Sequence, residues 1–291
     1  MDQRPLPPHV LIFPLPIQGH VNSMLKLAEL LSLAGLHVTF LNSPYNHRRL
    51  LQYADIQSRF ARYPGFRLET ISDGIPDDHQ RSGSRAVELF ANLFAVTPPL
   101  FREMMISGSL SSDGRPPVSC VIADGVLSFA IDVAKEIGVM SIVFRTVSAC
   151  ALWANFCFPQ LVQSGEVPFP KGKEDMDQLV MSVAGMEGFL RRRDLPSFCR
   201  VDDLSDPGFD VVMTETQKTS RADALILNTF EELEGPILSH IRSRCPILYT
   251  LGPLHAHLKT RLAAETTSVI NLGQETVLDD VSIADKLNIE L

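Results

Sequence analysis

The chain has 291 residues, of which 45% are hydrophobic and 21% are charged, as in a folded protein with one large domain or two smaller ones. Its net charge of −8 argues against nucleic acid or an anionic membrane as a partner, because those partners require clustered Lys and Arg. The five cysteines are odd in number and form no CxxC pair, which favours reduced thiols in a cytoplasmic protein without structural zinc. No apolar run is long enough to span a membrane.

Short apolar runs alternate with helical patterns along most of the chain, which is typical of a parallel sheet covered on both faces. The strand-like runs are Val10–Leu15, His37–Leu41, Arg67–Ile71, Ser119–Ala123, Ser141–Arg145, Ala224–Asn228 and Ile247–Leu251. The helical patterns are clearest at Gly19–Ala34, Ser84–Ile106, Ser128–Ile137, Ser148–Gln163 and Phe209–Arg221. We therefore predict an α/β fold with a Rossmann-like, seven-stranded parallel sheet and helices on both faces.

The first predicted crossover carries a histidine. The turn Pro16–Gly19 joins the apolar run Val10–Leu15 to a helical pattern, and His20 lies where that helix opens. Folds of this kind bind ligands in the crevice beyond the carboxyl ends of their strands. An imidazole there could accept a proton from a substrate hydroxyl, since its ordinary pKa is about 6.5. The alternative is that His20 only decorates the start of a helix.

Two further polar residues end predicted strands at the same edge. Asp124 follows the fourth strand, where a carboxylate could orient His20 and stabilise its protonated form, or could instead cap the helix Ser128–Ile137. Thr146 follows the fifth strand and could offer a hydroxyl to a polar ligand. Thr146 or Ser148 could equally be the N-cap of the next helix, and Ser148 is the better candidate.

The remaining regions carry fewer signals. Residues 165–207 contain four prolines and mixed charge, and we interpret them as surface loops and short helices that could line a pocket. After Pro253 only 38 residues remain, too few for a second complete α/β domain. Dinucleotide, phosphate-loop and nucleophile-elbow motifs are absent from the sequence. His255 and His257 lack further ligands in the sequence pattern, so no metal site is predicted.

Six motifs in order resemble those of a known family. They are Phe13–Asn22 (FPLPIQGHVN), Ser72–Pro76 (SDGIP), Ile122–Gly125 (IADG), Leu195–Phe198 (LPSF), Asn228–Glu234 (NTFEELE) and Leu251–Leu254 (LGPL). Together they resemble the N-terminal half of plant UDP-dependent glycosyltransferases of small molecules. The segment Leu254–Leu262 further resembles the branch that glucosylates iridoid acids.

The resemblance implies an inverting sugar transfer in a two-domain GT-B fold. In that family the histidine matching His20 is the general base, and the aspartate matching Asp124 holds and charges it. The threonine matching Thr146 contacts the donor sugar, and Gln18 and Gly19 would border the donor site. Proline is usual where Ser23 stands, but no function depends on this difference.

The resemblance also suggests the ligands. Trp153, Asn155 and Phe198 would fall in the acceptor pocket, although packing in the core explains these residues equally well. The acceptor would be an iridoid, terpenoid or phenolic that takes a sugar, usually glucose, on a hydroxyl or carboxyl group. UDP-sugar would be a co-substrate, and no cofactor is expected.

One part of the family pattern does not occur in this sequence. The family binds UDP-sugar mainly through a C-terminal signature containing His-Cys-Gly-Trp-Asn-Ser, whereas the only tryptophan here is Trp153. We expect 1–253 to form the acceptor-binding domain and 254–291 to be a linker remnant followed by an unrelated, poorly ordered tail, with the resemblance ending near Thr267. On this view the chain is truncated, binds UDP-glucose only if a C-terminal domain is supplied, and is inactive alone. The alternative is a non-catalytic protein that binds an acceptor or a full-length relative.

Overall fold

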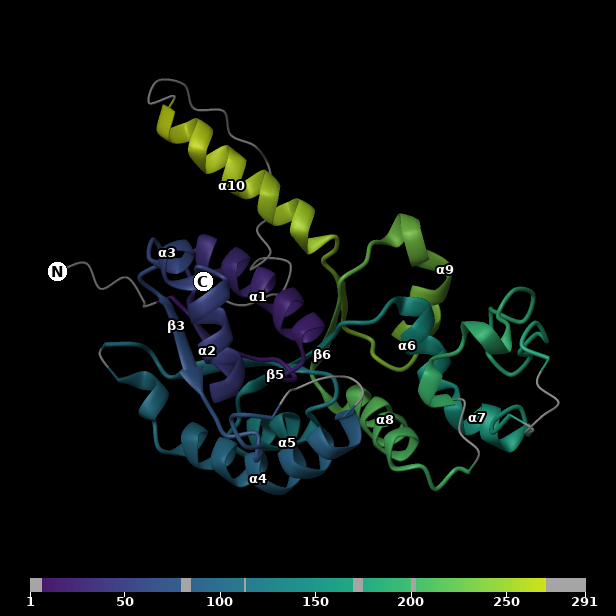
Figure 1. Cartoon of the computed structure of the whole chain (residues 1–291). Coiled ribbons are helices and arrows are strands. Elements are labelled where there is room, and N and C mark those ends of the chain that lie inside the picture. The colour runs from purple at the N-terminus through teal and green to yellow at the C-terminus, as the bar shows by residue number, and fades with distance from the viewer. Residues whose placement is uncertain (1–6, 80–84, 113, 170–174, 200–202, 271–291) are drawn as a thin grey trace.

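The computed structural model describes residues 7–79, 85–112, 114–169, 175–199 and 203–270. Its centre is one parallel sheet in the order β3-β2-β1-β4-β5-β6-β7 (Figure 1). The strands are β1 (His9–Phe13), β2 (His37–Asn42), β3 (Phe66–Thr70), β4 (Val118–Asp124), β5 (Met140–Arg145), β6 (Ala224–Leu227) and β7 (Leu248–Thr250). The predicted seven-stranded α/β fold is confirmed.

The order of the strands reverses between β1 and β4. The chain moves outward from β1 through β2 to β3, then returns to place β4 on the other side of β1. Phe13 at the end of β1 is in register with Ala123, one residue before the end of β4. The carboxyl ends of these two central strands therefore lie side by side at the switch point, where open α/β sheets bind ligands.

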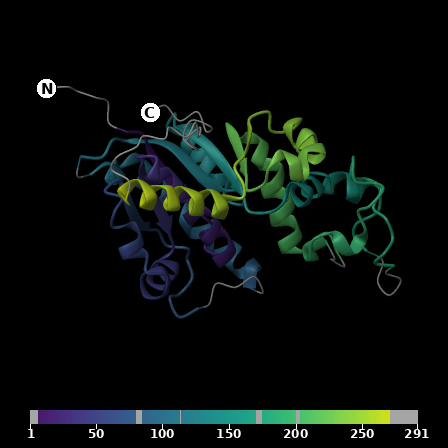
Figure 2. The same cartoon turned by 90° about the horizontal axis from the view of Figure 1, so that it is seen from above.

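Helices cover both faces of the sheet (Figures 1 and 2). On one face, apolar side chains of β1 and β2 pack against α1 (Gln18–Leu33), α2 (Pro44–Tyr53), α3 (Ile56–Phe60) and α10 (Leu254–Ile270). The other face packs against α4 (Ala86–Ile106), α5 (Ser128–Glu136), α6 (Ala149–Phe156), α7 (Phe158–Gln163), α8 (Pro207–Lys218) and α9 (Glu231–Arg242). Burial on both faces explains why the central strands are mostly apolar rather than alternating.

Several helices differ from the predictions. The single predicted helix Ser148–Gln163 is two helices, because the chain breaks at Cys157 and Pro159 can enter a helix only in its first turn. Helices α2, α3, α9 and α10 were not predicted. Helix α9 contains Gly235 and Pro236 and is bent at Glu234, and these residues obscured its periodicity.

The segment after α7 contributes to the core. Its described residues are mostly turns and short 3-10 helices, as predicted, but Val167, Val183 and Leu195 are almost fully buried against α6 and α9. Residues 170–174 and 200–202 of this segment lie outside the described residues. The segment is therefore packed structure as well as surface loop.

Helix α10 begins at Leu254, the last residue of the Leu251–Leu254 motif. Leu254 and Leu258 are buried in the apolar cluster between α1 and the sheet, so this helix packs along α1. The predicted boundary at residue 253 lies just before this helix, which packs against the sheet domain. The role of 254–291 as a linker stays a prediction, and residues 271–291 lie outside the described part of the chain.

Candidate active site

The turn from β1 to α1 places His20 at the switch point. Pro14 and Pro16 are buried in this turn, and the Ile17 amide donates to the Leu15 carbonyl, which closes it tightly. Helix α1 begins at Gln18, so His20 lies in its first turn, above the end of β1. Because proline fixes φ and lacks a donor, this sequence favours a sharp exit from the strand.

His20 and Asp124 are directly hydrogen-bonded. The distance between His20 Nδ1 and Asp124 Oδ2 is 2.6 Å, and the two side chains are 25% and 2% exposed. A carboxylate accepts, so Nδ1 carries the proton and Nε2 of the neutral ring is left as the basic nitrogen. The pair therefore has the arrangement of an oriented general base, with its carboxylate buried and its imidazole partly open to solvent.

The surroundings raise the pKa of His20 above its ordinary value of 6.5. Burial by itself would lower this pKa, but the negative charge of Asp124 and its hydrogen bond outweigh burial. Arg145 acts in the opposite direction and holds the rise back. The imidazole is thus a stronger base than a free histidine, which suits it to accept a proton.

The alternative role of Asp124 as a helix cap does not describe the structure. The residue before α5 is Leu127, and no side chain of its own caps the helix. Asp124 Oδ1 instead accepts from the Val126 amide at 3.3 Å, within its own turn. Glu215 of α8 caps the start of α5 instead, since its carboxylate accepts from the Ser128 amide at 2.9 Å and from the Ser128 hydroxyl at 3.0 Å.

Thr146 lies beside the pair. Its hydroxyl is 3.2 Å from His20 Nδ1, farther than Asp124, so the carboxylate is the main partner of that nitrogen. Ser148 is the N-cap of α6, as predicted, because its hydroxyl accepts from the Ala151 amide at 3.1 Å. Glu234 adds a second cap from α9 and accepts from the Ala149 and Cys150 amides at 3.0 Å each.

The predicted donor residues Gln18 and Gly19 are exposed at the start of α1. A Cβ built on Gly19 would meet nothing within 4 Å, so the space above this turn is open. No acidic side chain occupies the first turn of α1, and a helix start of this kind favours negative groups. Gln18, Gly19 and Thr146 therefore border the same open edge as His20.

Of the three predicted acceptor residues, Trp153 and Asn155 lie on α6, and Phe198 lies in a short 3-10 helix of the segment after α7. Trp153 is buried, stacks on His240 at a centroid distance of 5.2 Å and donates from Nε1 to the Ala184 carbonyl at 2.8 Å. Asn155 is 4% exposed, and Phe198 packs edge-on against Phe158 at 5.7 Å. The positions of Trp153 and Phe198 are explained by packing in the apolar cluster around α6. Their contact with an acceptor stays a prediction.

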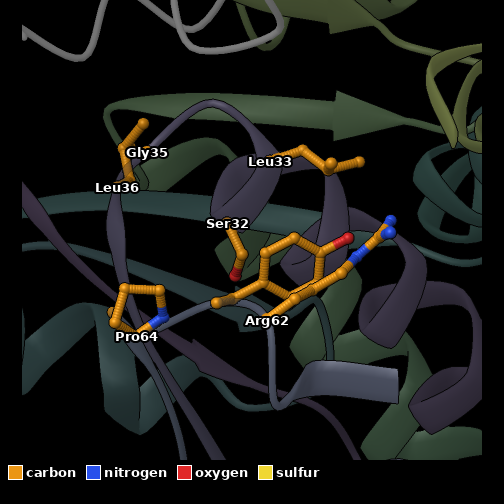
Figure 3. Close-up of a pocket in the computed structure, with 8 residues that line it drawn as sticks. Ser32, Leu33, Gly35, Leu36, Arg62 and Pro64 are labelled. Atoms are coloured by element: carbon orange, nitrogen blue, oxygen red, sulfur yellow. The ribbon is translucent and has the colours of Figure 1, made fainter. Parts of the chain in front are cut away.

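One cavity among the described residues lies well away from His20. This cavity, of about 320 Å³, opens at the far end of α1 from His20, between Ser32–Leu36 and Arg62–Gly65 (Figure 3). Within the described ranges, no three His, Cys, Asp or Glu side chains are placed to hold a metal ion. No helix among the described residues is long and apolar enough to cross a membrane.

The sequence analysis missed several polar residues that support the pair. Arg145, Glu215 and Thr216 are buried between β5, α5 and α8, and Glu234 joins α6 to α9. Each comes from an element far away in sequence from the group it contacts. The one available signal was the position of Arg145 at the end of the apolar run Ile142–Phe144.

Comparison with known proteins agrees with the motifs. No protein-family model matches the chain. The 7-deoxyloganetic acid glucosyl transferase of Catharanthus roseus is 55% identical over 97% of this chain and 58% of its own length. Myricetin 3-O-rhamnoside 1,2-glucosyltransferase of Crocosmia x crocosmiiflora is 41% identical over 86% of this chain and 52% of its own length.

The match to the Catharanthus protein extends farther than the motifs predicted. Because it covers 97% of the chain, it continues past Thr267 and leaves no room for an unrelated segment as long as 268–291. The chain spans somewhat more than half the length of the curated relatives it matches.

Solved structures show the same fold. An anthocyanidin 3-O-glucosyltransferase in complex with UDP superposes with a TM-score of 0.65 at 22% identity, over 84% of this chain and 52% of the other. A glycosyltransferase of Medicago truncatula complexed with UDP-glucose gives 0.63 at 21% identity, over 85% and 52%. The sheet is thus that of the N-terminal domain of the GT-B fold, and the chain is similar to plant UDP-dependent glycosyltransferases over about half of their length.

Proposed function

We propose that this chain supplies the base-bearing, acceptor-binding half of a UDP-dependent glucosyltransferase of small plant metabolites. The observation that carries the proposal is the 2.6 Å contact between His20 Nδ1 and the buried Asp124 carboxylate at the switch point of the sheet. The relatives named as glucosyltransferases support the reaction class. The free state of all five cysteines fits a cytoplasmic location, which is part of the proposal.

In the proposed reaction, His20 Nε2 takes the proton of the acceptor O–H group. The acceptor oxygen then bonds to the anomeric carbon of the sugar, the bond from that carbon to the UDP oxygen breaks, and UDP leaves with the electron pair. Attack opposite the leaving group inverts the configuration at the anomeric carbon. Asp124 stabilises the imidazolium formed on His20, and its burial keeps that interaction strong.

The other predicted residues complete the proposal. Gln18 and Gly19 would border the donor, because they open onto the same edge as His20. Thr146 would meet the donor sugar close to the base, since its hydroxyl already lies 3.2 Å from His20. An iridoid acid is the acceptor we propose first, because the Catharanthus relative is named for 7-deoxyloganetic acid.

Transfer from UDP-glucose to 7-deoxyloganetic acid tests this function. The assay uses residues 1–253 joined to the remaining part of the Catharanthus relative. We expect His20→Ala to lower kcat/KM by roughly 10²- to 10⁴-fold, the usual contribution of a general base. The matched control is His9→Gln, at the opposite end of β1, which should keep most of the rate. Equal rates for His20→Ala and the parent would contradict the proposal.

A second candidate is that residues 1–291 by themselves bind an acceptor without catalysing transfer, since these residues contain no donor signature. Several hydrogen bonds to the charged diphosphate would then be missing, each contributing roughly 1.5–3 kcal/mol. We expect calorimetry of this chain to show no micromolar binding of UDP-glucose. Micromolar binding would contradict that expectation, whereas a rise in Tm with an iridoid or phenolic alone would support acceptor binding.

A further inference from the structure

A buried arginine ends the strand next to the one that carries Asp124. Arg145 ends β5 and is only 5% exposed, which is unusual for arginine unless it serves a buried partner. Asp124 is in register with Phe144 across the two strands, so Arg145 follows on the opposite face of the sheet. The two charges therefore flank the same strand ends from different faces.

Arg145 is packed against the backbone that follows Asp124. A Cβ built on Gly125 would come within 2.0 Å of Arg145 Cδ and 2.7 Å of its Nε, so only glycine leaves room for this side chain. The Gly125 amide also donates to the Phe144 carbonyl at 2.9 Å. The turn that carries Asp124 thus rests on the stem of Arg145.

Helix α8 anchors both the arginine and the turn. Arg145 donates from Nη2 to the Thr216 hydroxyl at 2.6 Å, and Thr216 is completely buried. The neighbouring Glu215 accepts from the amide and hydroxyl of Ser128, where the turn enters α5. Arg145 Nε is buried without a hydrogen-bond partner, so the guanidinium keeps its position through packing, Thr216 and charge.

We propose that Arg145 is a positioning residue for the His20–Asp124 pair, which fixes the turn after Asp124 and places a permanent positive charge near its carboxylate. The charged groups around it agree with this role. Burial lowers the pKa of Arg145, while Asp124, Glu215 and Cys245 act to raise it. For His20, Asp124 raises the pKa and Arg145 lowers it, so the arginine limits how firmly the imidazole holds a proton. A base that holds its proton too firmly would be protonated and idle at neutral pH.

The test is an NMR titration of His20 in the intact chain, with the signal assigned by a His20→Gln variant. Arg145→Met removes the charge at similar length, and we expect the proton-binding constant of His20 to rise about three- to tenfold. Arg145→Lys keeps the charge and should stay within about twofold of the parent. An unchanged constant in a folded Arg145→Met protein would overturn the proposal.

A second variant covers the case in which Arg145→Met does not fold. Gly125→Ala keeps every charge but forces the arginine stem away from the turn. We expect it to change the proton-binding constant of His20 by at least about twofold, and no change would overturn the positioning role. Melting curves of each variant confirm that the folded protein is being measured.

The consequence for transfer rests on the proposed function. In the enzyme joined to the Catharanthus sequence, Arg145→Met should move the acid limb of kcat/KM to higher pH. The size of this shift should equal the change in the His20 pKa that the titration gives. If the titration shifts but His20→Ala leaves transfer unchanged, the proposed function fails while the positioning role stands. If His20→Ala abolishes transfer but the titration does not shift, the positioning role alone fails.

Discussion

Two histidines, eleven positions apart, lie at opposite ends of the first βα unit and have opposite surroundings. His9 begins β1 and is fully buried, with Nε2 2.8 Å from the Thr39 hydroxyl and Nδ1 3.0 Å from the Pro116 carbonyl. His20 follows the end of the strand, is partly exposed and contacts a carboxylate. Burial lowers the pKa of His9 to about 4, with Arg115 nearby adding to the effect, whereas Asp124 raises that of His20.

The difference shows what separates a structural histidine from a basic one. Both ring nitrogens of His9 are hydrogen-bonded to neutral groups. The ring therefore stays uncharged and links β1 to β2 and to the residues before β4 at the amino-terminal edge of the sheet. His20 has one nitrogen held by an anion and the other left for chemistry. A charged partner at a partly open position, rather than the histidine itself, marks the candidate active site.

The largest effect is expected when His20 loses its charged partner Asp124, because His9 has no such partner within hydrogen-bond distance among the described residues. Asp124→Asn keeps the shape but not the charge, so the imidazolium loses its stabilisation. We expect kcat/KM of the joined enzyme to fall by roughly 10²- to 10⁴-fold and the pKa of His20 to fall as well. Initial rates measure the first and NMR the second. A variant with full activity would show that the contact is structural only.

The next effect concerns His9 and stability. An unfolded chain binds a proton at His9 near pH 6.5, whereas the folded chain resists it down to about 4. The contribution of neutral His9 to the free energy of unfolding is therefore complete above pH 6.5. It is lost as pH falls from 6.5 toward 4, by up to ~3 kcal/mol. Urea unfolding at several pH values measures it, with His9→Gln as the uncharged reference. Parallel profiles for the two proteins would refute this assignment.

A smaller effect is expected at the helix that follows Thr146. Glu234→Ala removes the carboxylate that accepts from the Ala149 and Cys150 amides, and we expect the free energy of unfolding to fall by about 1–2 kcal/mol. The matched control is Glu232→Ala on the exposed side of the same helix, with little change expected. Chemical denaturation decides between them, and equal losses would mean that the cap contributes nothing.

The smallest effect is expected at Thr146 itself. Thr146→Val removes the hydroxyl 3.2 Å from His20 but leaves the Asp124 contact in place. A loss of about 0.5–1.5 kcal/mol, or about two- to tenfold in kcat/KM, corresponds to one secondary hydrogen bond. Steady-state kinetics with Thr146→Ser as the control measures it. A loss as large as that of Asp124→Asn would mean that Thr146 has a primary role.

Much of the fold could be predicted because burial leaves a strong local signal. Most of the strands are short apolar runs, whereas β3 at the edge of the sheet alternates Arg67 and Glu69 with apolar residues. Gly35 and Gly138 lie just beyond helix ends and have the positive φ that glycine permits there. The proximity of His20 to Asp124 also followed from topology, since Asp124 ends β4 and His20 follows the turn after the neighbouring parallel strand β1. Helix α9 was missed because Gly235, Pro236 and the bend at Glu234 interrupt its pattern.

The supporting residues could not be predicted in this way. Arg145 and Glu215 are residue types that normally face water, and only the packing of α8 against β5 buries them together. Trp153 could not be placed from the sequence either. The resemblance predicts that it contacts an acceptor, and the sequence did not show that it also stacks on His240 and donates to the Ala184 carbonyl. Local patterns predict which face is buried, but not which distant element covers it.

The most direct test is a single NMR titration that follows His9 and His20 in the same sample. The account predicts that His20 titrates above pH 6.5 and that His9 stays neutral until about pH 4. In Asp124→Asn the His20 value should fall toward or below 6.5, while that of His9 should not move. Two histidines that titrate together near 6.5, or a His20 value indifferent to Asp124, would contradict the central claim.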